Sequence, residues 1–279
     1  MFHKVLFVIF GIAIFFKDAS AQTDICTGKE DSIYSHALQE ERTYWIHLPE
    51  SYADSVQKKY SVIYLLDGDL FFHALVAAQR LYSQGRQPLM PECIIIGILN
   101  TDRTRDLTPS KSAYRRDGKR YDGDREIGGG SELFTSYLTD ELRIKINKKY
   151  RTNNINIIVG HSFGGLFALN TLMYHPQLFD IYVVLDPSFW WDNGKIQKEA
   201  DKLFETKQFN HIKLYLGIAA KIRPDANNIN SNIAGSFINN ILPKAIKNGL
   251  QVNYKIFSDE SHGTVPIPGI SDALKIIFQ

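Results

Sequence analysis

The sequence predicts an α/β fold with a mostly parallel, doubly wound sheet, helices on both faces and an antiparallel edge at its N-terminal end. Short, nearly continuous runs of apolar and β-branched residues recur along the chain and fit strands buried on both faces. Segments with apolar residues at helical spacing alternate with these runs from about residue 60 to the end. Because no internal repeat or long linker interrupts the alternation, we expect one domain.

The expected elements follow in chain order. Residues 42–48 alternate in character and predict a strand of an antiparallel pair. The runs that predict parallel strands are 60–66, 93–99, 155–159, 181–185, 212–216 and 252–257. The segments that predict helices are 131–148, with Ser131 as N-cap, 163–174, 195–206, 229–248 and 270–278. The charged, irregular stretch 100–130 is expected to be either a solvated surface loop or a flexible rim over a site.

The N-terminus has the organisation of a secretory signal peptide. Residues 5–16 are apolar and follow Lys4, but they are too few for a membrane span, which needs about 20 residues. Small residues at 19–21 form an A-x-A cleavage signal. We therefore expect residues 1–21 to be removed and residues 22–279 to form a secreted or periplasmic domain without membrane insertion. An uncleaved N-terminal anchor is the alternative.

Composition excludes several classes of function. The chain has 32 Lys and Arg against 30 Asp and Glu, a formal net charge of +2, which argues against a nucleic-acid partner. Neither zinc-site spacings nor a phosphate-binding glycine loop occur in the sequence, so no metal or cofactor is expected. The 2 cysteines, Cys26 and Cys93, are too few for a disulfide framework, and the sequence leaves their pairing and the oligomeric state open.

The most informative motif is G-x-S-x-G at residues 160–164, between an apolar strand run and an apolar helical segment. A serine hydroxyl is a poor nucleophile unless it is exposed, presented to a base and placed beside donors for an oxyanion. A sharp strand-to-helix turn would lift Ser162 above the sheet edge, and Gly160 and Gly164 leave room for that turn. We expect Ser162 to be a nucleophile; a glycine-rich turn capped by the serine is the alternative.

The base and acid should follow the serine in the order serine, acid, histidine. His262 comes directly after the last predicted strand, at the sheet edge that presents Ser162, and is the expected general base. His161, inside the motif, is expected to point away from the nucleophile. Three carboxylates could orient the imidazole: Asp225 is favoured, with Asp186 and Glu260 as alternatives, and a Ser–His dyad is the remaining possibility.

An oxyanion hole should combine the amide of Phe163 with an amide of the loop at residues 66–69, although a plain turn there is the alternative. Arg103 and Arg105 follow a strand end and could bind an anionic substrate group, or form buried ion pairs with Asp102 or Asp106. Trp190 and Trp191 follow another strand end and could stack on substrate or form part of the core.

These segments together resemble a known group: YLLDGD at 64–69, DRTRDLTP at 102–109, the motif at 160–164, PSFWWD at 187–192 and SHG at 261–263. They are similar to the putative esterase (esterase D-like) family of α/β hydrolases, and within it to the siderophore-esterase branch, which cleaves trilactone iron chelators. The likeness covers about residues 30–279.

The resemblance implies an α/β-hydrolase fold and a serine esterase for small-molecule esters. Ser162 and His262 match the nucleophile and base, and Asp69 matches the second oxyanion amide. The family commonly has a carboxylate soon after the strand equivalent to 212–216, whereas residues 217–222 contain none. The acid therefore stays open, and a dyad remains an alternative.

Relatives also include feruloyl and acetyl-xylan esterases and acyltransferases, so the ester could be a siderophore trilactone or a phenolic or sugar ester. The competing functions are acyl transfer to an alcohol and a catalytically silent binding protein.

Overall fold

A sheet of 8 strands forms the centre of the part of the chain that the computed structural model describes, which is residues 26–123, 125–221 and 229–279. The strand order is β1-β2-β4-β3-β7-β8-β9-β10, and β2 pairs antiparallel with both β1 and β4, while the remaining pairs are parallel. The strands are β1 (Lys29–Ser35), β2 (Glu40–His47), β3 (Tyr60–Leu65), β4 (Cys93–Ile98), β7 (Thr152–His161), β8 (Ile181–Leu185), β9 (Lys213–Ala219) and β10 (Gln251–Phe257).

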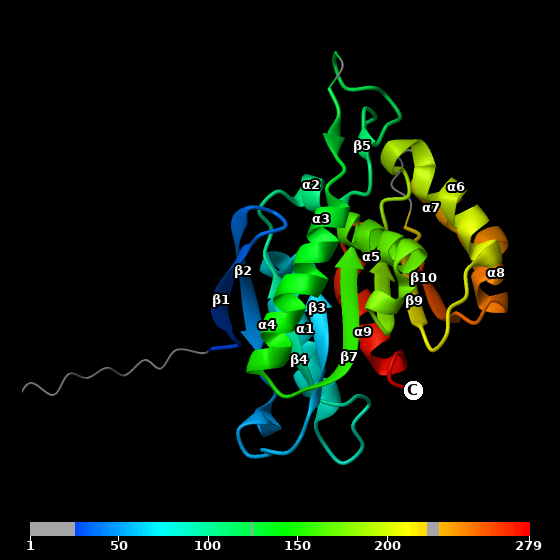
Figure 1. Cartoon of the computed structure of the whole chain (residues 1–279). Helices are drawn as coiled ribbons and strands as arrows, with labels where there is room; N and C mark the ends of the chain where they lie inside the picture. Colours follow the sequence, from blue (N-terminus) through cyan, green and yellow to red (C-terminus); the bar gives the residue numbers. More distant parts are fainter. Residues whose placement is uncertain (1–25, 124, 222–228) are drawn as a thin grey trace, which may run out of the picture.

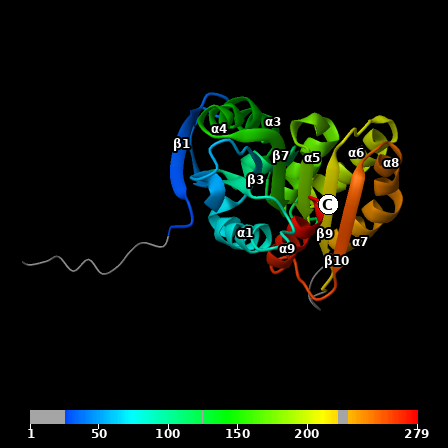
Figure 2. The ribbon, with the colours of Figure 1, turned by 90° about the horizontal axis from the view of Figure 1, so that it is seen from below.

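Helices cover both faces of this sheet (Figures 1 and 2). The helices are α1 (Gly68–Ser83), α2 (Arg103–Leu107), α3 (Ser131–Ser136), α4 (Arg143–Lys149), α5 (Phe163–Tyr174), α6 (Trp191–Thr206), α7 (Ile229–Ser236), α8 (Leu242–Lys247) and α9 (Pro266–Ile276). Short π-helical turns at Tyr137–Leu142 and Phe237–Ile241 join α3 to α4 and α7 to α8. In Figure 2, α1 and α9 lie on one face, and α4, α5, α6 and α8 lie on the other.

The predicted fold class is confirmed: the sheet is mostly parallel, has helices on both faces and carries an antiparallel N-terminal edge. The central strands are continuous apolar runs because both of their faces are buried. In β3, Val62 and Tyr64 pack into the core under one helix layer, while Ile63 and Leu65 pack into the core under the other. Alternating side chains of a single strand thus serve two cores.

Outside the stretch 100–130, one strand and one long helix were not predicted. β1 is a polar segment that lies at the edge of the sheet and pairs with β2 through its backbone, so its sequence carries no apolar signal. α1 begins at Gly68, inside the loop expected at residues 66–69, and buries Phe72, Leu75 and Val76. The N-cap of α3 is Gly130, and the predicted cap Ser131 is the first residue of the helix.

The stretch 100–130 is more regular than expected. It contains α2 and a small hairpin of β5 (Lys111–Ser112) and β6 (Ile127–Gly128), which projects past the ends of the central strands in Figure 1. The base of the hairpin is fixed because the indole of Trp191 donates to the carbonyl of Ser110 at 3.0 Å, and the hydroxyl of Ser110 donates to Asp192 at 2.7 Å.

The remaining predictions from the sequence concern the N-terminus, the residue Asp225, the two cysteines and membrane insertion. The predicted signal peptide at residues 1–21 and the favoured acid Asp225 both lie outside the described residues. Cys26 is exposed and Cys93 is buried, and both are free thiols. Within residues 26–123, 125–221 and 229–279, no helix has the length and apolar character needed to cross a bilayer.

Close packing at the start of α5 gives a test of the strand-to-helix turn. A Cβ at Gly160 would lie 2.2 Å from the carbonyl oxygen of Gly164, whereas a Cβ at Gly235 in α7 would meet nothing within 4 Å. Gly160→Ala should therefore lower the free energy of unfolding by about 3 kcal/mol or more. Gly235→Ala should raise it by about 0.5–1 kcal/mol. Urea unfolding followed by circular dichroism measures both; equal midpoints for the two variants would contradict the packing argument.

Candidate active site

The turn between β7 and α5 presents Ser162 at the carboxyl edge of the sheet. Ser162 has φ 58° and ψ −116°, a conformation that L-residues rarely adopt and that strains the backbone. Backbone hydrogen bonds to adjacent segments of the protein support this conformation. The amide of Ser162 donates to the carbonyl of Leu185 at 3.0 Å, and the carbonyl of Ser162 accepts from the amides of Leu166 at 2.8 Å and Ser188 at 3.1 Å. The turn at Ser162 is therefore bound both to its own helix and to the end of β8.

Three side chains from three different loops form a hydrogen-bonded chain at this edge. The Nε2 atom of His262 lies 3.0 Å from Ser162 Oγ, and its Nδ1 atom lies 2.6 Å from Asp186 Oδ2. Asp186, at the end of β8, is 4 % exposed. An ionised carboxylate can only accept, so Nδ1 carries the proton and Nε2 is left free to accept the hydroxyl proton of Ser162. This is the arrangement that a serine needs for activation by a general base.

The carboxylate in contact with His262 is Asp186, one of the alternatives. The favoured Asp225 lies outside the described residues. Asp186 follows β8, the strand beside β7, and its backbone has φ 38°. The contact found for Glu260 is made by its backbone: the main-chain carbonyl accepts from the amide of Lys221 at 2.9 Å. The acid-free stretch 217–222 contacts Asp186, because the amide of Ala219, the last residue of β9, donates to Asp186 Oδ1 at 3.4 Å.

His161 contacts His262, which the sequence did not suggest. Its Nε2 atom lies 2.8 Å from the carbonyl oxygen of His262, and the two rings are 4.6 Å apart at their centroids. Since a carbonyl only accepts, Nε2 of His161 must carry the proton. Burial, and to a smaller extent the nearby His262, lower the pKa of His161 to about 4. His161 is therefore neutral at physiological pH and anchors the backbone of the histidine loop.

Helix N-termini supply free amide donors beside Ser162. Phe163 is the first residue of α5, and Gly68 and Asp69 open α1. None of these amides donates to a protein acceptor within the described part of the chain, as expected for the first turn of a helix. Asp67, which precedes α1, has φ 53° and is 1 % exposed. The positive end of α5 therefore lies at Ser162, and that of α1 follows Asp67, whose carboxylate lies 3.3 Å from the Cβ position of Gly164.

The candidate substrate-binding arginines are engaged with carboxylates of the protein. Arg103 contacts Asp67 through Nε at 2.5 Å and Nη2 at 2.9 Å, and its guanidinium lies 5.3 Å from the ring centroid of Phe163. Arg105 pairs with Glu40 and Asp106 at 2.6 Å and 2.7 Å. Asp102, considered as an ion-pair partner, instead caps α2 by accepting from the amide of Arg105. Arg103 thus fixes the loop that carries the amides of α1.

The two tryptophans differ in exposure. Trp191 is 1 % exposed and packs against Phe163 with ring centroids 5.0 Å apart, so it belongs to the core. Trp190 is only partly buried and lies 5.7 Å from the same phenylalanine ring. Trp190 is therefore the member of the pair that can reach a bound molecule.

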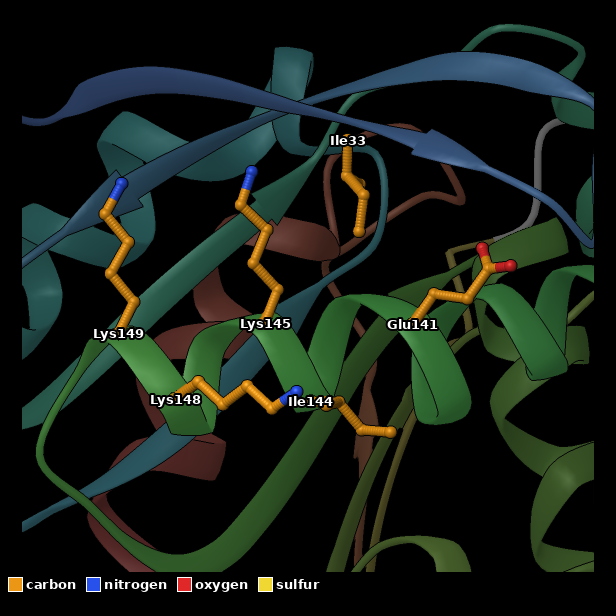
Figure 3. A pocket seen from close by; sticks show the side chains of 6 residues that line it. All are labelled: Ile33, Glu141, Ile144, Lys145, Lys148 and Lys149. Carbon is orange, nitrogen blue, oxygen red and sulfur yellow. The ribbon is translucent and has the colours of Figure 1, made fainter.

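A separate hollow of about 440 Å³ lies between β1 and α4 and contains none of the residues around Ser162. Figure 3 shows the side chains of Lys145 and Lys149 extending from α4 towards β1, while that of Lys148 runs along the helix. Two of these amines are neutralised, because Lys145 and Lys149 contact the carboxylate of Asp31 at 3.2 Å and 2.8 Å. Among the described residues, no group of His, Cys, Asp and Glu side chains could hold a metal ion.

Comparison with known proteins identifies esterases as relatives of this chain. The family model described as Putative esterase matches residues 35–245. The chain is 29% identical over 252 residues to the ferri-bacillibactin esterase BesA of Bacillus subtilis, covering 85% of each protein. It is 32% identical over 158 residues to the siderophore enterobactin esterase of Emericella nidulans, covering 53% of this chain and 52% of that protein.

Among solved structures, the chain resembles an IroE-like serine hydrolase from Shewanella oneidensis. The TM-score is 0.84 and the sequences are 32% identical, with 90% of this chain and 80% of that chain covered.

The buried, neutral His161 predicts an acid sensitivity of the fold. Its pKa is about 4 in the native state and 6.5 in an unperturbed chain, so between these values the unfolded state binds the proton first. The free energy of unfolding should then decrease as the pH falls from 6.5 to 4, by up to about 1.4 kcal/mol per pH unit from this group. His161→Gln, which keeps an amide donor but cannot titrate, should reduce that slope. Denaturant unfolding at half-unit pH steps measures it, and an unchanged slope would disprove the assignment.

Proposed function

The chain belongs to the Putative esterase family and is a hydrolase that acts on esters, and we propose that it works through a serine nucleophile and an acyl-enzyme. The observation that carries the proposal is the continuous contact from Ser162 through His262 to Asp186, with distances of 3.0 Å and 2.6 Å. In this proposal Ser162 is the nucleophile, His262 the general base and Asp186 the carboxylate that holds the imidazole.

The hydrogen-bond directions define the proposed reaction. Ser162 Oγ attacks the ester carbonyl while its proton passes to Nε2 of His262, and Asp186 stabilises the resulting imidazolium. The tetrahedral intermediate then expels the alcohol, which takes that proton. In the second half, His262 removes a proton from water, the hydroxide attacks the acyl-enzyme, and the proton returns to Ser162 as the carboxylic acid leaves.

The amides of Phe163 and Asp69 are the proposed oxyanion hole. Each belongs to the first turn of a helix and has no competing protein acceptor among the described residues. Such donors are effective because they are already oriented and cost no reorganisation when charge develops on the carbonyl oxygen. The ion pair between Arg103 and Asp67 supports this site indirectly by holding the loop before α1.

The proposed substrate is a small-molecule ester of the siderophore class, since the relatives BesA and the Emericella enzyme are named as siderophore esterases. The partly exposed ring of Trp190, beside Phe163, could stack on an aromatic acyl group of such a substrate, or of a phenolic ester. A secreted or periplasmic location belongs to the proposal as well, and it depends on the signal-peptide pattern of residues 1–21.

Substitutions of the three side chains test the mechanism. Ser162→Ala should lower kcat/KM for p-nitrophenyl acetate by at least about 10⁴-fold and abolish labelling by a fluorophosphonate probe. Asp186→Asn should cost about 10²–10⁴-fold, because the imidazole loses its fixed tautomer and the stabilisation of its cation.

Asp225→Asn and Glu260→Gln are the matched controls and should retain activity close to the unmodified protein. Labelling that persists in Ser162→Ala would refute the nucleophile. A large loss in Asp225→Asn with full activity in Asp186→Asn would reassign the acid.

Arg103→Met separates support of the oxyanion loop from substrate binding. Because the guanidinium is engaged by Asp67, its loss should lower kcat by about 10–100-fold, which corresponds to a weakened oxyanion donor, while KM changes by less than about threefold. Steady-state kinetics on p-nitrophenyl acetate and on an iron-chelating trilactone provide the two parameters. An increase in KM at constant kcat would show instead that Arg103 binds substrate.

A further inference from the structure

A second serine touches the nucleophile. Ser188 Oγ lies 3.1 Å from Ser162 Oγ, and the residue is 1 % exposed. Its hydroxyl has no other hydrogen-bond partner within the described part of the chain. A buried hydroxyl normally has a partner, and the one available here is the reacting oxygen of the proposed mechanism.

The backbone holds Ser188 in this position. Its amide donates to the carbonyl of Ser162 at 3.1 Å, and its carbonyl accepts from the amide of Trp191 at 3.0 Å. It also lies two residues after Asp186, so one turn at the end of β8 carries both the carboxylate and this hydroxyl. The contact is therefore a fixed feature of the turn, not the chance orientation of a surface side chain.

The number of protons decides the direction of the hydrogen bond. Ser162 has one hydroxyl proton, and the bare Nε2 of His262 at 3.0 Å accepts it. Ser162 Oγ can then only accept from Ser188, and Ser188 must donate. We propose that Ser188 is a further catalytic residue, whose hydroxyl donates to Ser162 Oγ and stabilises the negative charge that develops there. This inference depends on the proposed serine mechanism.

The expected effect follows from when Ser162 Oγ carries charge. It does so as it loses its proton to His262 during attack on the ester, and again when the second tetrahedral intermediate breaks the C–Oγ bond to release the acid. The donor from Ser188 bonds more strongly to the charged oxygen than to the neutral hydroxyl, so it favours both transition states over the resting state. Ser188 itself neither gains nor loses a proton.

Pre-steady-state kinetics with p-nitrophenyl acetate test this inference, because the burst and the steady phase report acylation and deacylation separately. Ser188→Ala should slow both steps, by about 5- to 50-fold, with substrate affinity unchanged. Ser188→Cys, which keeps a weak donor in a similar volume, should be intermediate. Ser61→Ala is the control, since Ser61 is also buried but lies in β3 and contacts Asn153, and it should react at the unmodified rate.

The outcomes separate the role of Ser188 from the serine mechanism on which it depends. Acylation and deacylation rates in Ser188→Ala within twofold of the unmodified protein, together with an inactive Ser162→Ala, would overturn the role of Ser188 alone. An active Ser162→Ala would overturn the serine mechanism and this inference with it. If Ser188→Ala does not fold, as judged by its thermal unfolding, the rates of Ser188→Cys decide: unchanged rates reject the role and reduced rates support it.

Discussion

The site depends on one geometric constraint, which is that neighbouring parallel strands end at the same edge of a sheet. Ser162 follows β7, Asp186 follows β8 and His262 follows β10, so three residues distant in the chain meet within hydrogen-bond distance. A parallel sheet needs helical crossovers between its strands, and these bury both faces. The two apolar cores therefore hold the strand ends in register, and the loops above them can carry polar and strained residues.

Three residues at this edge have a strained backbone. Asp67, Ser162 and Asp186 all have positive φ values, 53°, 58° and 38°, although none is glycine. Such conformations cost about 1–3 kcal/mol each and persist only where the surroundings enforce them. Each has such surroundings here: Arg103 holds Asp67, the end of β8 holds Ser162, and the amide of Asp186 donates to Gly217 at 2.7 Å. The packed cores and the contacts around these residues thus stabilise backbone conformations that would otherwise be unfavourable.

Local sequence patterns identified the buried strands and the glycine-flanked serine, because both leave a signal in adjacent residues. The buried strands were visible because both of their faces are apolar, and Ser162 was visible because its turn requires glycines at 160 and 164. His262 followed from its place directly after the last strand, and the structure brings it to 3.0 Å from Ser162. By contrast, β1 and α1 were missed, since β1 gains its place through backbone pairing and α1 starts within a segment that reads as a turn.

The sequence by itself determined the fold class, through the alternation of buried strands and helices, and it predicted Ser162 and His262 from motifs of adjacent residues and their place after strand ends. Only the tertiary structure showed that Asp186 meets the imidazole, that His161 holds the backbone of His262, that Arg103 binds Asp67 and that Ser188 touches Ser162. These contacts join segments that are distant in the sequence, at distances of 2.5–3.1 Å. A shift of a strand end by one residue would break them, and nothing in the local pattern of either loop records where the other one ends.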